Sequence, residues 1–512
     1  MKVTMKIGSL LTRNARYRPW HIAIVFEGQR VSFRDFNLRV NRLANALLEL
    51  GVWKGDKVVS ILPNCLELLD LYWAAAKIGV VAVPLTPLLR GKALVNLIRD
   101  SDATTVITNS EFAGVVDVIK PDLTAVQADR YILTDNGGSF SGYRCYRDLT
   151  TAANDAEPQD IAIADDDPYN LIYSSGTTGQ PKGIIHSHRI RSMYGLIFAS
   201  TFRMQPDSVM MNAGSIVFNG AFVTLMPAMY LGATFILNRQ FDAGGCIETI
   251  KRERITHVMM VPSQITAVLR SPRFSAEALE SLEMICSVGA PLHKEHKEEL
   301  NRQLPGRLYE LYGLTEGFAT VLDKNDYSRK PDSVGAPIPF CEMRIVNDAG
   351  DEARAGEVGE ILGRGSLLMD GYYKQPCLTA QTIIDGWLHT GDLGYADQDG
   401  FLYLVDRKKD MIISGGANVY PRDIEEVILQ HTAVHEAAVF GIPDEKWGET
   451  PMAAVILREH ASITAEELRD WINERVGAKN QRIQAMVILE DFPRNTAGKT
   501  LKRALRETYR TR

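Results

Sequence analysis

Cysteine pairs and an excess of positive charge are both missing from this 512-residue sequence. The six cysteines are scattered and form no C-x-x-C pair, which argues against a disulfide framework and against a cysteine-based zinc site. The formal net charge is −6, whereas nucleic-acid-binding proteins carry a basic surface. We therefore expect a cytoplasmic protein that does not bind nucleic acid.

Long apolar runs are also scarce. The first residues, MKVTMKIGSLL, lack the apolar core of a signal peptide. The longest apolar run, at 221–237, is barely long enough to span a bilayer and contains Pro227 and Gly232. A buried helix followed by a strand is the better interpretation of this run, so we expect no integral membrane segment.

The first part of the chain alternates between helical and strand-like patterns. Residues 31–51 predict a short strand and then a helix, because apolar side chains recur at helical spacing. These side chains are Phe36, Val40, Leu43, Leu47 and Leu50. The runs 57–63 and 80–85 predict buried strands, and 66–79 predicts the helix between them. Such alternation predicts an α/β fold with doubly wound sheets.

Two later regions have different patterns. Short alternating segments between about 330 and 405, such as CEMRIVND and GEILGRG, predict a small β-barrel or antiparallel sheet. The charged stretch RKKD then marks a boundary, which gives an N-terminal domain over 1–408 and a small α+β domain over 409–512. In the small domain, Thr464 and Glu467 form a capping-box pattern at the start of a helix.

The stretch YSSGTTGQPKG, at 173–183, has the strongest chemical signal. Its glycines allow several N–H groups to converge, its hydroxyls add donors, and Lys182 adds a positive charge suited to phosphate. A flexible linker is the alternative, but strand-like segments flank the stretch on both sides. The P-loop spacing is absent, since the sixth position counted from Gly176 is Pro181. We predict a phosphate-binding loop of another kind.

Other stretches are ambiguous when each is taken alone. SVGAP at 287–291 and YGLTE at 312–316 follow strand-like segments, and Glu316 offers an oxygen ligand for Mg²⁺. Asp392, which we expect in a tight glycine-bounded turn, could accept the hydroxyls of a ribose. Lys499 follows a polar turn near the C-terminus, where a lone lysine is usually only solvated.

Taken in order, YSSGTTGQPKG, YGLTE, TGDLG, DRKKD and NTAGK closely resemble the ANL superfamily of adenylate-forming enzymes. The resemblance covers nearly the whole chain, including the two-domain division. It implies attack of a carboxylate on the α-phosphate of ATP, giving an acyl-adenylate and pyrophosphate. In acyl-CoA synthetases, the thiol of coenzyme A then displaces AMP. The implied cofactors and substrates are ATP, Mg²⁺, coenzyme A and a small carboxylic acid.

The resemblance also assigns roles to residues of the large domain. The β- and γ-phosphates would be held by Ser174, Ser175, Gly176, Thr177, Thr178, Gly179 and Lys182. The adenine would lie against Tyr312 and Gly313, beside Gly289, Ala290 and Pro291. Thr315 would contact the α-phosphate, and Glu316 with Thr178 would hold Mg²⁺.

Residues nearer the C-terminus would complete the site. Asp392 and Arg407 would bind the ribose, and Lys499 would bridge the acyl carboxylate and the α-phosphate. The small domain would swing between the two half-reactions about a hinge at Lys409. The residues facing the pantetheine arm of coenzyme A would be Ser414, Gly415 and Gly416.

The acyl pocket departs from the family pattern. Phe218 takes the place of a histidine that many relatives carry, and the residues after it, Asn219 and Gly220, are small. This combination favours a medium- or long-chain fatty acid, or an aryl acid, over acetate.

Other functions stay open at this point. The main alternative to an acyl-CoA synthetase is a stand-alone adenylation enzyme that loads a carrier protein, which would act in trans because no carrier-like segment follows Arg512. A luciferase-type monooxygenase and a catalytically silent nucleotide-binding scaffold are more remote. The sequence also leaves open whether the chain forms a homodimer.

Overall fold

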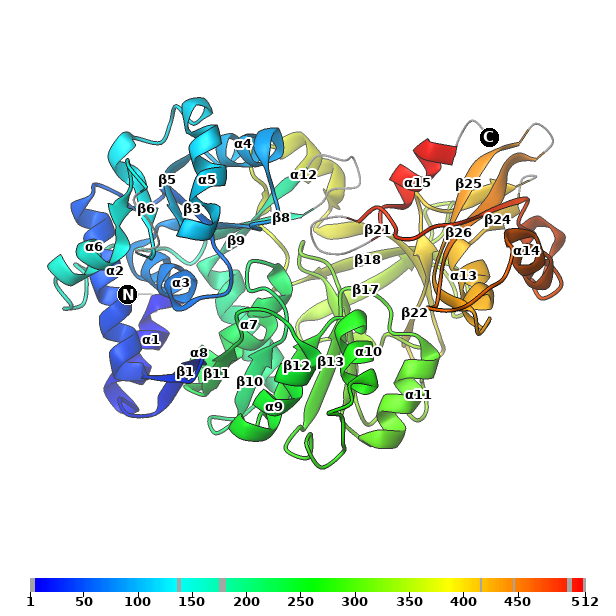
Figure 1. Cartoon of the computed structure of the whole chain (residues 1–512), viewed down its shortest axis with the longest axis horizontal. Coiled ribbons are helices and arrows are strands. Elements are labelled where there is room, and N and C mark those ends of the chain that lie inside the picture. The colour runs from blue at the N-terminus through cyan, green and yellow to red at the C-terminus, as the bar shows by residue number, and fades with distance from the viewer. Residues whose placement is uncertain are drawn as a thin grey trace. The chain divides into compact units, whose positions relative to one another are not determined.

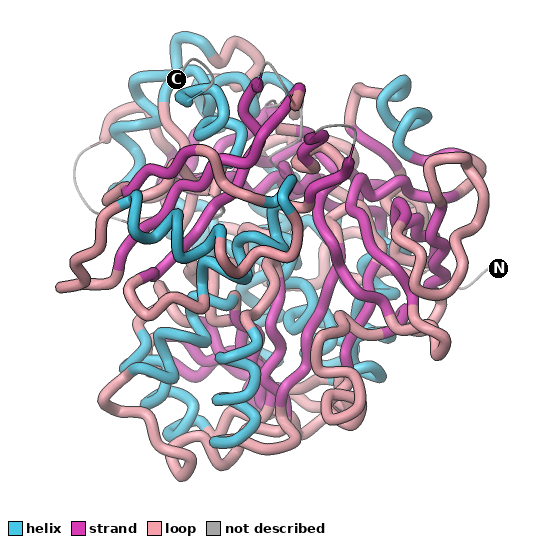
Figure 2. Tube along the Cα trace, turned by 90° about the vertical axis from the view of Figure 1, so that its right-hand side faces the viewer, coloured by secondary structure: helices cyan, strands magenta, loops and turns pink. Residues whose placement is uncertain are grey.

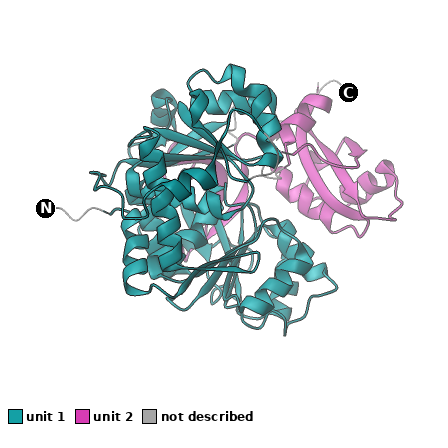
Figure 3. Cartoon of the chain, turned by 60° about the vertical axis from the view of Figure 1, so that its left-hand side comes forward, with its two compact units in different colours: residues 1–342, 363–388 teal, residues 343–362, 389–512 magenta. Residues whose placement is uncertain are grey.

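The fold is taken from a computed structural model of the whole chain (Figure 1). It describes residues 5–135, 140–174, 181–414, 417–444, 447–494 and 500–509. The chain divides into two compact units, which are coloured separately in Figure 3. Unit 1 comprises 1–342 and 363–388, and unit 2 comprises 343–362 and 389–512.

Unit 1 contains two large sheets, and Figure 2 shows the strands of the chain in magenta. Both sheets are parallel in their middle and antiparallel at one or both edges. The first sheet has the order β16-β15-β14-β13-β12-β10-β11-β1-β2. Its strands are β1 (Ile22–Phe26), β2 (Gln29–Ser32), β10 (Val209–Asn212), β11 (Thr234–Leu237), β12 (His257–Met260), β13 (Met284–Val288), β14 (Leu308–Gly313), β15 (Ala319–Leu322) and β16 (Ala336–Pro337).

The second sheet has the order β19-β9-β8-β4-β3-β5-β6-β7. Its strands are β3 (Lys57–Ile61), β4 (Val81–Leu85), β5 (Ala103–Thr108), β6 (Tyr131–Leu133), β7 (Arg144–Cys145), β8 (Pro168–Ser174), β9 (Lys182–Ser187) and β19 (Gly371–Tyr372). Its two faces bury different residues of the same strands: Val58 joins the main core of unit 1, whereas Val59 joins a smaller core. Both faces are therefore covered, as parallel sheets require.

Helices of unit 1 supply these two cores. The helices are α1 (Gly8–Tyr17), α2 (Phe33–Glu49), α3 (Leu66–Ile78), α4 (Gly91–Asp100), α5 (Ser110–Ile119), α6 (Tyr146–Ala152), α7 (His188–Thr201), α8 (Phe222–Leu231), α9 (Ala243–Glu253), α10 (Pro262–Arg270), α11 (Lys294–Gln303) and α12 (Pro376–Thr382). Side chains of α2, α3, α7 and α8 share the main core with strands of both sheets, and α4 and α5 cover the other face of the second sheet. The predicted doubly wound α/β fold is confirmed.

A third sheet is built from five described strands that lie between residues 341 and 407. Its strands are β17 (Cys341–Val346), β18 (Gly359–Gly365), β20 (Ile383–Ile384), β21 (Trp387–Ala396) and β22 (Leu402–Arg407). The β21–β22 hairpin closes at 397–400, where the Gly400 amide donates to the Asp397 carbonyl at 3.0 Å. The strand-rich character predicted for this region is confirmed.

The part of unit 2 after residue 407 is a small α+β body. Its strands are β23 (Ile412–Ser414), β24 (Ala417–Val419), β25 (Val434–Asp444), β26 (Gly448–Leu457) and β27 (Ala485–Ile488). Its helices are α13 (Pro421–Leu429), α14 (Ala465–Asn473) and α15 (Lys502–Tyr509). The predicted capping box is confirmed at the start of α14, where the Glu467 amide donates to Thr464 Oγ1 at 3.2 Å and the Thr464 amide donates to Glu467 Oε2 at 2.9 Å.

The long apolar run at 221–237 folds as predicted, into a buried helix and a strand. α8 is buried along nearly all its length, ends at Gly232 in the left-handed conformation, and is followed by β11. Pro227 lies inside the helix. In the part of the chain that the structure describes, no helix is both long and apolar enough to cross a membrane.

Candidate active site

Two antiparallel strands frame the predicted phosphate loop. β8 ends at Ser174 and β9 begins at Lys182, and these two residues are cross-strand partners. The neighbouring pair, Tyr173 and Gly183, continues the register. The loop residues Ser175, Gly176, Thr177, Thr178 and Gly179 lie outside the described residues. The two strands thus fix the points where the loop leaves and rejoins the second sheet.

Lys182 is buried against an aromatic ring. The residue is 8% exposed, and its Nζ atom lies 4.8 Å from the centroid of the Tyr372 ring, a cation–π distance. Tyr372 belongs to β19, which pairs with β9. None of the described carboxylates forms an ion pair with Lys182. Since no such carboxylate neutralises this ammonium, it keeps its attraction for an anionic ligand such as a phosphate.

The Tyr372 side chain links Lys182 to Glu316. Its hydroxyl donates a hydrogen bond to Glu316 Oε1 at 2.9 Å, while the ring covers Lys182. Burial and the charge of Glu316 raise the pKa of Tyr372 well above its ordinary value, so the phenol stays a donor at neutral pH. The predicted phosphate-binding lysine and the predicted Mg²⁺ ligand are therefore brought together through a tyrosine.

The turn that carries Thr315 and Glu316 follows β14 directly. The Met369 amide donates to the Glu316 carbonyl at 2.8 Å. Gly317 has a φ of +113°, and a Cβ atom at this position would lie 1.9 Å from the Leu367 carbonyl oxygen. Any residue with a side chain would therefore displace the turn, so the glycine is required for the position of Glu316.

β13 and β14 end side by side at one edge of the first sheet. The two strands are parallel, and Val288 pairs with Leu311. The predicted adenine-binding residues are exposed after β13 or close β14, and they are Gly289, Ala290, Pro291, Tyr312 and Gly313. The Tyr312 ring meets the Phe318 ring edge to face, with 6.3 Å between their centroids. Because parallel strands present their carboxyl ends at the same edge, these segments form one surface.

A buried ion pair supports this edge. Glu310 of β14 pairs with Lys297 of α11, and Glu310 Oε1 accepts a hydrogen bond from the Leu292 amide at 3.2 Å. Both charged side chains are at most 8% exposed. The pair is buried, and its hydrogen bond from the Leu292 amide fixes the segment that begins at Gly289.

The predicted acyl-pocket residues lie at the start of α8. Phe218 packs against the main core, and the short 3-10 helix Asn219–Ala221 follows it. Asn219 Nδ2 donates to the Tyr194 hydroxyl of α7 at 3.1 Å. A Cβ atom on Gly220 would lie 3.4 Å from the Met259 methyl carbon. The surroundings of this turn are therefore mostly aromatic and aliphatic.

In unit 2, Asp392 and Arg407 are direct cross-strand partners on β21 and β22. Arg407 Nε lies 3.2 Å from Asp392 Oδ1, and the aspartate side chain is 12% exposed. The prediction that Asp392 lies in a tight turn is wrong, because Asp392 is inside strand β21. A Cβ atom on the flanking Gly394 would lie 2.6 Å from the Tyr403 carbonyl oxygen, so this glycine permits close strand approach at a bulge.

Glu360 of β18 anchors the same strands. Its Oε1 atom accepts a hydrogen bond from the Gly391 amide at 3.3 Å, and its Oε2 atom lies 3.0 Å from Lys408 Nζ. His389 Nδ1 lies 3.6 Å from Oε1. This carboxylate thus fixes the strand that carries Asp392 and pairs with the lysine that precedes the predicted hinge.

The remaining predicted residues of unit 2 lie at strand ends. Lys409 is exposed in the turn after β22, and Ser414 is buried at the end of β23. Gly415, Gly416 and Lys499 lie outside the described residues. Lys502, the first residue of α15, places its Nζ atom 2.6 Å from Glu425 Oε1. That ion pair fixes the start of α15, three residues after Lys499.

The Lys182 ammonium and the Glu316 carboxylate of unit 1 suit a magnesium-bound triphosphate. Mg²⁺ is usually held by one or two carboxylates together with phosphate oxygens, and Glu316 supplies one carboxylate next to the Lys182 ammonium. Among the described residues, no group of three or more His, Cys, Asp or Glu side chains could hold a metal ion by itself. A metal at Glu316 would therefore depend on the oxygen atoms of its ligand.

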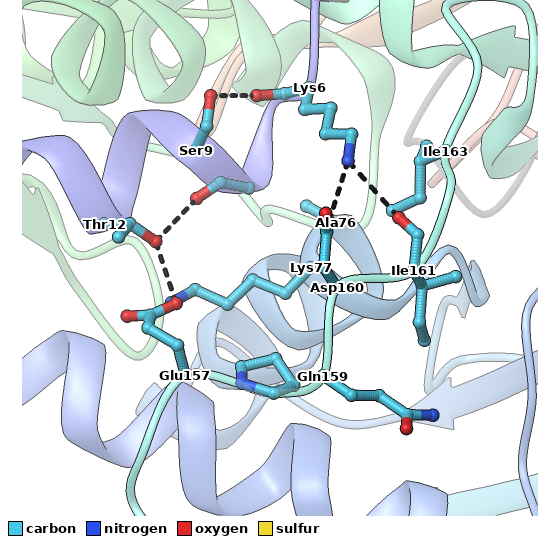
Figure 4. Close-up of a pocket in the computed structure, with 12 residues that line it drawn as sticks. Lys6, Ser9, Thr12, Ala76, Lys77, Glu157, Gln159, Asp160, Ile161 and Ile163 are labelled. Carbon is cyan, nitrogen blue, oxygen red and sulfur yellow. Dashed lines mark hydrogen bonds and ion pairs between the residues drawn. The ribbon is translucent and has the colours of Figure 1, made fainter.

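A separate pocket of about 250 Å³ lies between α1, α3 and residues 157–163 (Figure 4). Its charged groups already have partners: Lys77 Nζ donates to Asn37, Asn41 and Glu157 at 2.6–2.7 Å. Lys6 Nζ lies 3.1 Å from Asp160 Oδ1. These contacts give the pocket a structural role, so we do not place the active site there.

Sequence reasoning did not single out Tyr372 or Glu360, or the fully buried polar residues His186 of β9 and Arg191 of α7. Tyr372 and Glu360 carried no motif that could have marked them. His186 did carry a signal, because it follows two isoleucines in the strand-like segment GIIHS. Arg191 also carried a signal, because it is three and seven residues before Tyr194 and Phe198. This helical spacing places a charged residue on the buried face of α7.

Models of two protein families match the chain. An AMP-binding enzyme model matches residues 11–373, and a model of the AMP-binding enzyme C-terminal domain matches residues 423–499. The first model alone spans more than half of the 512 residues and includes the strands that frame the predicted phosphate loop.

Curated proteins and solved structures resemble the chain along nearly its whole length. A feruloyl-CoA synthase of Amycolatopsis sp is 32% identical over 98% of this chain and 99% of its own. A long-chain-fatty-acid–CoA ligase of Mycobacterium tuberculosis is 33% identical over 98% of both chains. The structure of ATP-bound MatB from Rhodopseudomonas palustris superposes with a TM-score of 0.91, at 29% identity over 99% of both chains.

Proposed function

The chain belongs to the AMP-binding enzyme family, and from this premise we propose that it is an AMP-forming acyl-CoA synthetase. It would join a carboxylic acid to coenzyme A in two half-reactions. In the first, a carboxylate oxygen bonds to the α-phosphorus of ATP and pyrophosphate leaves. In the second, the thiol of coenzyme A attacks the acyl carbon, AMP leaves, and the thiol proton is released.

One observation carries the proposal: Lys182 and Glu316 meet through Tyr372 beside the frame of the phosphate loop. The first half-reaction brings an anionic carboxylate to an anionic phosphate, so it needs positive charge and fixed geometry. Lys182, together with Ser174 and residues 175–179, would hold the β- and γ-phosphates. Glu316, with Thr178, would hold Mg²⁺, which lowers the negative charge of the triphosphate when it is bound.

The nucleoside would be held by residues at several strand ends. Tyr312 and Gly313 would pack on the adenine beside the Gly289–Pro291 segment, and Thr315 would contact the α-phosphate. Asp392 would accept hydrogen bonds from the ribose hydroxyls, since a carboxylate is an acceptor and Arg407 already orients it at 3.2 Å.

The small domain would act by changing its position between the half-reactions. We place the boundary between residues 408 and 409, with the hinge at Lys409. Lys499 would bridge the acyl carboxylate and the α-phosphate in the first half-reaction. Ser414, Gly415 and Gly416 would face the pantetheine arm of coenzyme A in the second.

The acid would be a medium- or long-chain fatty acid or an aryl acid. The start of α8 supports this, because Phe218, Gly220 and the neighbouring Met259 offer apolar contacts and few charges. The names of the relatives, a feruloyl-CoA synthase and a long-chain-fatty-acid–CoA ligase, support the same two classes.

An acid screen tests this function. The purified enzyme is incubated with ATP, Mg²⁺, coenzyme A and single acids that include acetate, malonate, succinate, ferulate, octanoate and palmitate, and pyrophosphate and acyl-CoA are measured. We expect octanoate, palmitate or ferulate to react fastest. A clear preference for acetate would exclude the proposed pocket. Pyrophosphate release without acyl-CoA, followed by transfer to an added carrier protein, would favour the carrier-loading alternative.

We also propose a cytoplasmic location and a homodimer. Cys65, Cys246 and Cys286 are buried free thiols, as expected for a reducing compartment. Light scattering would give about twice the chain mass of 56.9 kDa for a homodimer, and the mass of one chain would exclude it.

A further inference from the structure

A buried hydrogen bond links the second sheet to the turn that carries Thr315 and Glu316. His186 of β9 is fully buried, and its Nε2 atom lies 2.8 Å from the Thr315 carbonyl oxygen. A carbonyl oxygen only accepts hydrogen bonds, so Nε2 must carry the proton. This side-chain bond acts on the peptide unit that joins Thr315 to Glu316, and the orientation of that unit sets where both side chains project.

Arg191 of α7 determines which nitrogen of His186 is protonated. Arg191 Nη2 lies 3.2 Å from His186 Nδ1, and a guanidinium only donates hydrogen bonds, so Nδ1 must be the acceptor. The ring is therefore neutral with its proton on Nε2. Burial and the charge of Arg191 also lower the pKa of His186 well below its ordinary value, which excludes the doubly protonated ring near neutral pH.

Arg191 itself is held by uncharged groups. The residue is fully buried, its Cζ atom lies 4.0 Å from the centroid of the Phe222 ring and 4.7 Å from that of Tyr194, and its Nε atom donates to Asn170 Oδ1 at 3.3 Å. None of the described residues pairs a carboxylate with Arg191, and its Nη1 atom has no hydrogen-bond partner among them. A buried charge held in this way is costly, so a role beyond packing is expected for it.

On the basis of the proposed function, we propose that His186 is a positioning residue for adenylate formation and that Arg191 positions His186 in turn. Neither side chain would touch the substrates. His186 would hold the Thr315–Glu316 peptide in the orientation that lets Thr315 meet the α-phosphate and Glu316 meet the metal. Misplacement by about 1 Å can cost about 100-fold in rate, so a peptide turned away would be seen mainly in kcat.

Two substitutions of similar size separate positioning from packing. His186→Gln places an amide nitrogen where Nε2 was and keeps a donor for Thr315, whereas His186→Asn reaches only the position of Nδ1. In pyrophosphate exchange with the acid that reacts fastest in the screen, we expect His186→Gln to keep kcat within about 3-fold. We expect His186→Asn to lose about 10- to 100-fold in kcat, with little change in the KM for ATP. Equal losses in the two variants would overturn the proposal, as would an effect confined to KM.

Arg191→Met provides the second arm. Met has a similar length but cannot fix the tautomer of His186. We therefore expect Arg191→Met to lose kcat with every acid, but by less than His186→Asn. The double variant Arg191→Met/His186→Asn should be no slower than His186→Asn alone, because both changes act through one hydrogen bond. If Arg191→Met instead slowed only the reaction with malonate or succinate, Arg191 would bind the second carboxylate of the acid, and the proposal would be wrong.

Two further measurements keep the result independent of substrate identity and of folding. The melting temperatures of the two His186 variants should agree. If the two variants differed in kcat only at temperatures where one of them is partly unfolded, the proposal would be contradicted. Crystal structures of these variants should show the Thr315 carbonyl oriented as in the wild type for Gln and turned away for Asn. If no acid supports pyrophosphate exchange, the proposed function fails, but the carbonyl orientation still decides the role of His186: an unchanged carbonyl in the Asn variant would overturn it.

Discussion

Two cations of unit 1 and three cations of unit 2 differ in the groups that contact them. In unit 1, Lys182 and Arg191 lie against aromatic rings, and neither is paired with a described carboxylate. In unit 2, Arg407, Lys408 and Lys502 each lie within 3.2 Å of a carboxylate oxygen. Lys182 therefore has no described carboxylate to neutralise its charge, whereas these three cations of unit 2 are each paired with one.

This difference suggests that the cations have different roles. An aromatic ring stabilises a cation without cancelling its field, so Lys182 can still attract a triphosphate. A carboxylate at hydrogen-bond distance cancels most of the field and gives structural order in exchange. We infer that Lys182 of unit 1 serves binding, whereas Arg407, Lys408 and Lys502 of unit 2 shape the strands and the start of α15.

Lys499 is the strongest test of the comparison, because it would be a cation of unit 2 that binds substrate. We predict that Lys499→Ala lowers acyl-adenylate formation by at least about 100- to 1,000-fold, since one preorganised charge contact at the reacting phosphate is lost. Thioester formation from supplied acyl-adenylate should be spared. The two half-reactions are measured separately, by pyrophosphate exchange and by acyl-CoA release.

The control for this variant is Lys479→Ala, which removes an exposed lysine of the same unit. It should leave both half-reactions unchanged. Equal loss in the two half-reactions of Lys499→Ala would remove Lys499 from the proposed role.

Lys182→Met sharpens the comparison from the side of unit 1. The apolar chain can occupy the same space against Tyr372, but the charge is gone. We predict a loss of about 100-fold in kcat/KM for ATP with a melting temperature within about 2 °C of the wild type. Steady-state kinetics of pyrophosphate release with varied Mg·ATP and thermal unfolding provide the two measurements, and calorimetric titration with Mg·ATP reports the binding step separately. A large loss of stability with intact ATP binding would reverse the interpretation of this cation.

Lys502→Met is the matched change in unit 2, and its expected effect is the opposite. It leaves Glu425 without its cation in a partly buried position, where its side chain is 17% exposed. We predict a destabilisation of about 2 kcal/mol, seen as a melting temperature lower by about 4–8 °C. Lys502→Arg, which keeps the charge, should recover much of that loss. A melting temperature unchanged by Lys502→Met would refute the structural role of the pair.

Asp392→Asn gives the smallest expected effect. Asparagine keeps the shape but weakens both the contact with Arg407 and the acceptor offered to a ribose. We predict a KM for ATP raised by about 10-fold with a smaller change in kcat. Asp399→Asn, in the exposed turn of the same hairpin, serves as the control and should leave the KM for ATP unaltered. An equal shift in both variants would count against a direct contact with the nucleotide.

Much of the fold was predictable from local patterns. The helical spacing from Phe36 to Leu47 predicted α2, and the short apolar runs around Val58 and Val83 predicted β3 and β4. The pairing of strands was not predictable in this way. β19, a strand of only two residues, joins the second sheet beside β9 although more than 180 residues separate them in sequence.

The site was predictable only where a motif marked it. Lys182, Glu316, Asp392 and Arg407 stood in recognisable stretches. Tyr372 connects the first two, but a tyrosine in a short strand carries no pattern that distinguishes it from a core residue. The turn assigned to Asp392 failed for a related reason: glycines near a strand can permit close backbone approach as well as a turn, and local sequence does not separate the two.

The register of the β8–β9 hairpin has a consequence for how this enzyme could be altered. Ser174 and Lys182 are opposite each other, so whatever sequence joins them has to close only the short gap between two neighbouring strands. The hairpin is anchored in the sheet on both sides, by β4 and by β19. We therefore expect that the linking segment can be exchanged between homologous enzymes, and that such exchanges would change phosphate affinity if this segment holds the phosphates as proposed.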